Sequence, residues 1–176
     1  MALSAENVNV GTTGAIYVGA TSATAPTSAV ATLTGFTDLG YVSADGVSET
    51  RDRSTNQIRA WQNSDLVREV VTEATATFSA TLLETSAATL AAYYGATVTG
   101  GVIEIDPAST GGRKSFVIDL IDGADAIRTY IPAGEILSVG EQVYQNGEPV
   151  GYEITITAYA SAAGYSFKKF YSALAA

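Results

Sequence analysis

The sequence predicts a mainly β protein: an antiparallel β-sandwich or partial barrel with one short flanking α-helix. Short runs rich in Val, Ile, Thr and Tyr recur along the chain, and turn signals of Gly, Pro, Asn and Asp separate them. The segment 74–82, ATATFSATL, alternates between apolar and hydroxyl side chains, as a strand with one buried face does. Only the segment 85–94 has the composition and the end signals of a helix.

The first half of the chain is predicted to form strands joined by glycine-containing turns. Residues 14–19, GAIYVG, indicate a strand, and residues 20–34 indicate a loop with a weak strand. A further strand is expected at 38–43, followed by a turn at Asp45-Gly46. After a long polar stretch, residues 66–71 return as a strand that leads into the alternating segment.

The single helix has clear signals at both ends. Thr85 or Ser86 can cap its N-terminus, because a side-chain hydroxyl accepts a hydrogen bond from a free backbone N–H. Gly95 stands just after it, where helices often end in the left-handed conformation. Residues four apart share a helix face. We therefore expect one buried stripe, formed by Ala87, Leu90 and Tyr94.

The second half of the chain is predicted to be β structure again. Asp122-Gly123 and Asn146-Gly147 are hairpin signals between these segments. Because turns rather than long helical crossovers follow the strands, the sheets should be mainly antiparallel. The expected strands are residues 102–105, 113–121, 126–131, 135–145 and 150–160, before an aromatic tail at 165–174.

Composition limits the possible functions. The 176 residues suit a single domain, 1–176, with 9 basic and 18 acidic side chains and a net charge of −9. An acidic protein lacks the basic face that holds nucleic acid. The absence of Cys and His removes thiolate nucleophiles, Cys/His zinc sites and serine triads. The N-terminus lacks the pattern of a signal peptide, and no apolar run reaches membrane-spanning length, so we expect a soluble protein made in a cytoplasm.

Three patterns could suggest a ligand or an active site. Residues 109–115 superficially resemble a phosphate loop, but its first glycine and its lysine are replaced, so a hairpin loop is favoured. Asp119, Asp122 and Asp125 do not have EF-hand spacing, and Asp122-Gly123 indicates a turn. Scattered carboxylates could form a hydrolase pair. We expect no enzyme activity, no metal and no cofactor.

The most charged stretch, 47–73, contains the only tryptophan, Trp61. Ser54-Thr55-Asn56 and Gln62-Asn63-Ser64-Asp65 within it are turn-prone clusters. A polar ribbon without a buried face is marginally stable by itself, so we expect an extended interaction arm that packs on a neighbouring molecule. Trp and Arg are enriched at interface hot spots. The candidate contact residues are Arg51, Arg53, Ile58, Arg59, Trp61 and Arg68.

About a third of the chain, 40–95, resembles the major tail tube proteins of long-tailed, non-contractile bacteriophages, especially those of actinobacterial hosts. The shared features occur in order. They are AWQ at 60–62, VR at 67–68, LLET at 82–85 and YYG at 93–95. The family often carries a C-terminal immunoglobulin-like decoration domain, and this sequence leaves no room for one. The resemblance therefore implies the tube domain alone.

The resemblance implies a structural virion protein. In that family, subunits form hexameric rings whose inner sheets join into one barrel around a lumen, and a long hairpin reaches the adjacent subunit or ring. The implied partners are other copies of the chain, the tape-measure protein, the tail terminator and the distal tail protein. Double-stranded DNA would pass through without specific binding, and no membrane is involved. The implied location is the phage tail, assembled in the cytoplasm of the host bacterium.

A DNA conduit requires a polar and acidic lumen, because cations on the wall would bind phosphates and stall transit. Strand alternation suggests which side chains form that wall. The candidates are Glu73, Thr75, Thr77, Ser79, Thr81, Asp119, Glu153, Thr155 and Thr157.

Other functions remain open at this point. A tube of a type VI secretion system or a contractile injection machine would share the fold and pass proteins. A capsid decoration or surface β-domain would form a discrete monomer or trimer. A carboxylate-based hydrolase would need a pocket with convergent acids.

Overall fold

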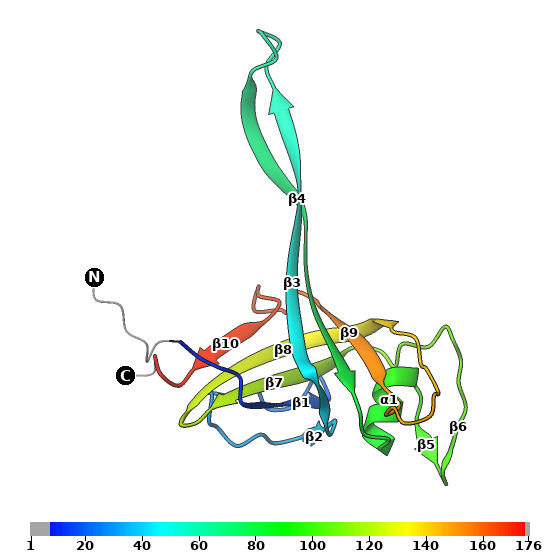
Figure 1. Cartoon of the computed structure of the whole chain (residues 1–176). Helices are drawn as coiled ribbons and strands as arrows, with labels where there is room; N and C mark the ends of the chain where they lie inside the picture. Colours follow the sequence, from blue (N-terminus) through cyan, green and yellow to red (C-terminus); the bar gives the residue numbers. More distant parts are fainter. Residues whose placement is uncertain (1–7, 175–176) are drawn as a thin grey trace.

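The structure is a computed structural model and describes residues 8–174. It contains an eight-stranded antiparallel sheet with the strand order β2-β1-β7-β8-β9-β4-β3, in which β10 also pairs with β8 (Figure 1). The strands of this sheet are β1 Thr13–Gly19, β2 Phe36–Asp38, β3 Val42–Arg59, β4 Leu66–Leu82, β7 Lys114–Asp122, β8 Asp125–Val139, β9 Tyr152–Ala158 and β10 Lys168–Tyr171. The remaining elements are the helix α1 Ala87–Tyr94 and a two-stranded sheet of β5 Val98–Thr99 and β6 Val102–Ile103.

The large sheet is rolled into a partial barrel, because β1 contacts β3 although the two strands are far apart in the strand order. The apolar core lies inside this roll, and α1 covers one end near β9 (Figure 1). The predicted fold class, an antiparallel β-sandwich or partial barrel with one short helix, is therefore confirmed. The largest buried side chains of the core are Phe116, Ile16, Leu39, Leu82, Ile131, Ile154 and Ile156.

The strict alternation at 74–82 is confirmed from Ala76 onward. Phe78 and Leu82 are buried in the core, whereas the hydroxyl side chains between them face outward and are half-buried. Each large apolar side chain moved from water into such a core contributes about 1.5–3 kcal/mol. This burial fixes the register of β4, because a slip by one residue would place the hydroxyls in the core.

The helix has the predicted ends but a different buried face. The Ser86 hydroxyl accepts a hydrogen bond from the Thr89 N–H at 3.1 Å, and Gly95 ends the helix with φ 65°. A side chain at Gly95 would meet the backbone of 109–111, so glycine is required there on two grounds. The expected stripe is wrong at Ala87, which is exposed, whereas Leu90 and Tyr94 are half-buried and pack against the core. The fully buried helix positions are Thr89, Ala92 and Tyr93.

Several predicted turns lie inside long strands. Asp45-Gly46 falls within β3, where the register shifts between Val42 and Val47 and Gly46 has φ 69°. Ser54-Thr55-Asn56 is also strand, with another register shift between Ser54 and Thr55. Small polar residues and glycine mark β-bulges as well as turns, and sequence alone does not distinguish the two. The predicted strand at 38–43 is divided, because residues 39–41 link β2 to β3.

The predicted break between 131 and 135 is absent. β8 continues through Pro132. Pro132 is unpaired in the β7–β8 ladder, where the pair of Ile131 with Phe116 is followed by the pair of Gly134 with Lys114. Asn146-Gly147 is a turn, but it lies within the long connection 140–151 and does not form a tight hairpin between β8 and β9. Asp122-Gly123 does form the predicted turn between β7 and β8.

Candidate functional site

The two predicted polar walls form a single surface. β9 lies directly beside β4, so that Thr157 pairs with Thr77, Thr155 with Ser79, and Glu153 with Thr81. Residues paired directly across a ladder point to the same side of the sheet. The Ser79 and Thr155 hydroxyls are hydrogen-bonded at 3.0 Å. Sequence alternation identified both rows of side chains, and the sheet topology brings the rows together.

The neighbouring strands on both sides widen this surface. On β3, Ser48, Thr50 and Asp52 pair with Ser79, Thr77 and Thr75. On β8, Glu135 pairs with Thr157 and Ser138 with Thr155. Sequence alternation did not predict these five residues of β3 and β8 as part of the wall, although Ser48, Thr50 and Asp52 show a two-residue period. We call the whole set, on β3, β4, β9 and β8, the polar face.

The polar face carries hydroxyl groups and acids but no Lys or Arg. Its charged members are Asp52, Glu135 and Glu153, and Glu135 accepts a hydrogen bond from the Thr110 hydroxyl. Glu73 is exposed and lies two residues beyond Thr75 on β4. A surface with this composition stays hydrated and repels polyanions.

Both outer edges of the four-strand layer are free. β3 is the last strand of the sheet, so one of its edges has no neighbouring strand. On the other side of the layer, the last pair between β7 and β8 is Lys114 with Gly134, so the Glu135–Val139 segment of β8 extends beyond β7. No described residue forms a β-ladder along either edge. Unpaired strand edges readily pair with another chain.

Asp119 does not belong to an exposed wall. Its side chain is buried, and both of its carboxylate oxygens accept hydrogen bonds from Arg128 at 2.7 Å. Arg128 also donates to the backbone carbonyls of Ser28 and Ala31, so this ion pair ties the loop 20–35 to the barrel. The candidate role of Asp119 in the lumen is therefore replaced by a structural role.

We expect Asp119→Ala to destabilise the subunit by about 3 kcal/mol, because it leaves the Arg128 guanidinium buried without its partner. Urea denaturation of the dissociated subunit would measure the change. The exposed carboxylate of Glu104 provides a control, and its replacement by alanine should cost about 0.5 kcal/mol or less. Equal effects of the two substitutions would contradict the assigned role of the ion pair.

The hairpin of β3 and β4 extends far beyond the barrel (Figure 1). β9 accompanies β4 only as far as Ala76, so residues 52–75, which we call the ribbon, have no third strand beside them. Every residue of the ribbon is exposed except Ala60, which is half-buried. Asn63 and Ser64 form the predicted turn at its tip with φ 54° and 57°.

The candidate contact residues all lie on or next to the ribbon and are open to solvent. Trp61 is 97% exposed at the tip, and Ile58 is 48% exposed directly across from Arg68. Arg59 donates to the Ser64 carbonyl and so stabilises the turn. A tryptophan exposed to this degree contributes no burial to its own subunit, which is the expected property of a contact made with another molecule.

The other ribbon arginines differ in their ion pairing. Arg51, next to the ribbon on β3, lies 3.4 Å from Glu49, which also forms an ion pair with Lys169 of β10. Arg53 and Arg68 form no ion pair with any described residue. These two guanidinium groups therefore remain free to pair with acids of a partner.

A tyrosine cluster holds the connection 140–151 at the end of the polar face. Tyr93 donates its hydroxyl to the Gly140 carbonyl at 2.7 Å, and Tyr94 donates to Gln142 at 2.9 Å. Burial raises the pKa of both phenols above 10.0, and the nearby Tyr144 raises it further. The stabilisation linked to this shift is fully present below pH 10 and is lost as the pH rises through the raised pKa values.

The described residues contain no group of three His, Cys, Asp or Glu side chains that could hold a metal ion. Within residues 8–174, no helix has the length and apolarity needed to span a membrane. The loop at 109–115 connects to β7, a strand, rather than to a helix N-terminus. The conspicuous surfaces of the described chain are thus the polar face, the free edges and the ribbon.

Two solved structures illustrate the similarity of the fold. A chain of the extended sheath-tube complex of an extracellular contractile injection system, PVC, matches with a TM-score of 0.54 and 10% identity. The match covers 94% of this chain and 93% of that chain. A chain of the anti-feeding prophage cap, described as the AFP tube terminating cap, matches with a TM-score of 0.51 and 10% identity over 96% of this chain and 98% of that one.

No curated protein sequence matches the chain. The family model described as "Phage tail tube protein" matches residues 1–173, which is nearly the whole sequence. The model includes the ribbon and the polar face as well as the segment that carries the sequence resemblance. The chain therefore belongs to the phage tail tube protein family.

Proposed function

We propose that copies of this chain close into hexameric rings and that the rings stack into the tail tube of a long-tailed, non-contractile phage. The polar face lines the lumen through which DNA leaves the virion. The observation that carries this proposal is a four-strand layer with a polar outer face and a free edge on each side. The family supports a structural role in a phage tail rather than catalysis.

The direction of the strands supports ring closure. Along the layer β3, β4, β9 and β8, each strand is antiparallel to the next. Consequently β3 is antiparallel to β8, and rotation about a ring axis preserves that relation between one copy and the next. The β3 edge of one subunit meets the Glu135–Val139 edge of its neighbour as an antiparallel pair. The joined layers continue the same alternation around the lumen, which leaves neither edge of the four-strand layer open.

The polar face supports passage of DNA. Each cation on a lumen wall would release counterions on binding a phosphate and add affinity that slows transit. Asp52, Glu135 and Glu153 instead repel the duplex, and the hydroxyl rows keep the wall hydrated. The predicted residues Glu73, Thr75, Thr77, Ser79, Thr81, Thr155 and Thr157 belong to this proposed wall.

The ribbon makes the contacts between subunits or rings. Its contact residues are those predicted from the sequence, with Trp61 at the centre. The tape-measure protein fills the lumen before DNA does, and the tail terminator and the distal tail protein meet the two ends of the tube. Assembly takes place in the cytoplasm of the host bacterium, and the product is part of the virion.

Negative-stain electron microscopy of the purified protein tests the proposal directly. We expect hollow rings or tubes with six-fold symmetry in end views. A discrete monomer or trimer over a wide range of concentrations would contradict the proposal and would favour a decoration or surface β-domain. An N-terminally tagged and a C-terminally tagged preparation should give the same particles, which controls for a tag that blocks stacking.

A further inference from the structure

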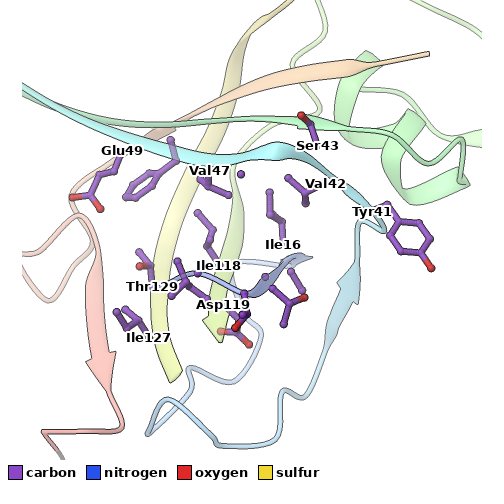
Figure 2. Close-up of a pocket in the computed structure, with 18 of the residues that line it drawn as sticks. Ile16, Tyr41, Val42, Ser43, Val47, Glu49, Ile118, Asp119, Ile127 and Thr129 are labelled. Atoms are coloured by element: carbon purple, nitrogen blue, oxygen red, sulfur yellow. The ribbon is translucent and has the colours of Figure 1, made fainter. Parts of the chain in front are cut away.

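The barrel contains an open pocket of about 780 Å³ along the seam between β3 and β1 (Figure 2). Val42 and Val47 of β3 point from one side toward Ile16 of β1 and Ile118 of β7 on the other (Figure 2). Pockets of about 300–1,000 Å³ with apolar linings are typical of specific binding sites. The seam therefore offers a cleft with room for a large side chain, and apolar side chains form part of its walls.

The lining of this pocket contains more acidic than basic residues. Asp38, Glu49, Glu84 and Asp119 are among its residues, and Lys169 is its only basic residue. Glu49 is paired with Lys169, and Asp119 with Arg128. Asp38 and Glu84 form no ion pair within residues 8–174. The pocket thus combines an apolar interior with two carboxylates that lack a cationic partner in the described chain.

The ribbon has the complementary properties. Trp61 and Ile58 are exposed apolar side chains near its tip, and Arg68 pairs directly with Ile58 across the ladder. Arg53 and Arg68 form no ion pair within residues 8–174. A ribbon end that carries exposed apolar side chains and guanidinium groups without an ion pair matches a cleft that has apolar walls and carboxylates.

The ribbon cannot fill the pocket of its own subunit. From Asp52 to Arg59 the chain is extended and points away from the barrel, a length of about 23 Å at the usual strand rise, and Trp61 lies in the turn beyond it (Figure 1). The ribbon tip and the seam pocket therefore lie on different parts of the molecule. A contact of this kind between copies is heterologous, and it can join copies within a ring or link one ring to the next.

We propose that the ribbon tip of one copy docks in the seam pocket of another, with Trp61 in the apolar interior and Arg68 facing Asp38 and Glu84. This inference rests on the proposed tube and goes beyond it by assigning the acceptor site. Docking also fills a cleft that is open in the single subunit.

Cross-linking tests the contact, and the natural chain contains no cysteine that would interfere. Gln62→Cys places a thiol beside Trp61, and Ala44→Cys places one on the pocket lining. A short bis-maleimide should link assembled copies of this double variant into a series of dimers, trimers and larger multimers, because each copy carries both cysteines. The matched control combines Gln62→Cys with Glu148→Cys, an exposed position outside the pocket. Linked multimers should be about ten-fold more abundant than in this control.

Each outcome of the cross-linking decides between the two proposals. If tubes form but linked multimers are no more abundant than in the control, the docking site is overturned and the tube proposal stands. Absence of any tube or ring would overturn both. The charge match is tested by Arg68→Glu, which should lower the yield of linked multimers in the double variant, and by adding Glu84→Arg, which should restore it. Failure of the second substitution to restore linking would contradict the assigned pairing.

Discussion

Replacing Trp61 by alanine is expected to leave a folded subunit that no longer forms tubes. The indole is 97% exposed, so its removal takes no packing from the subunit and should change the free energy of unfolding by about 0.5 kcal/mol or less. In the proposed tube the same side chain is buried at a contact with a neighbour. Truncation of a buried interface tryptophan costs about 2–4 kcal/mol. Such a loss weakens each contact by roughly 30-fold to 1,000-fold.

Two measurements separate these effects. Urea denaturation of the dissociated subunit reports the folding change, and sedimentation over a concentration series reports the critical concentration for assembly. Trp61 is the only tryptophan, so its fluorescence emission should also shift to shorter wavelength when the unsubstituted chain assembles. Trp61→Phe is the matched control, because it keeps an aromatic side chain and should retain part of the assembly. Unchanged tube formation by Trp61→Ala would remove the ribbon from the assembly mechanism.

Substituting Glu73 and Glu153 by lysine is expected to leave assembly intact and to make the lumen of the proposed tube bind and retain DNA. Both side chains are exposed, and neither forms an ion pair within the described chain. The change moves the charge of each subunit by +4, because two acids become two bases. Contacts repeated around every ring add affinity for phosphates through counterion release, and high salt should weaken the binding steeply.

Nuclease protection identifies where the DNA is held. Tubes assembled with short duplex DNA are treated with nuclease, and the protected DNA is measured at low and high salt. The lysine variant should protect about ten-fold more DNA than unsubstituted tubes at low salt. The control variant, Glu104→Lys with Glu148→Lys, has the same charge change at exposed positions outside the polar face, so any DNA that it binds should remain open to the nuclease. Equal protection by the two variants would show that Glu73 and Glu153 do not face the lumen.

The sequence predicted the elements whose pattern is set by local physics. Alternation along 76–82 and 152–158 gave both rows of the polar face, because a half-buried strand must separate apolar from polar side chains. The caps of α1 were predictable for the same reason, since Ser86 and Gly95 satisfy the backbone groups at the helix ends. The polar composition around Trp61 likewise indicated that its partner lies outside the subunit.

Features that depend on long-range pairing could not be predicted. Asp119 alternates like a wall residue, and only the pairing of β7 with β8 shows that Arg128 stands opposite and neutralises it. The bulges in β3 look like turns in the sequence, so the ribbon was expected to contain interruptions that the structure does not have. The seam pocket joins residues from strands far apart in the chain and has no local signal at all.

The alternating direction of β3, β4, β9 and β8 has a mechanical consequence. If the junction between subunits repeats the antiparallel pairing found within each subunit, tension around the circumference is shared by backbone hydrogen bonds of one kind, without a weak line between protomers. Internal pressure would then be resisted equally in every direction across the ring. In the proposed tube, side chains of the ribbon rather than backbone ladders would join successive rings, so bending and rupture would instead concentrate there.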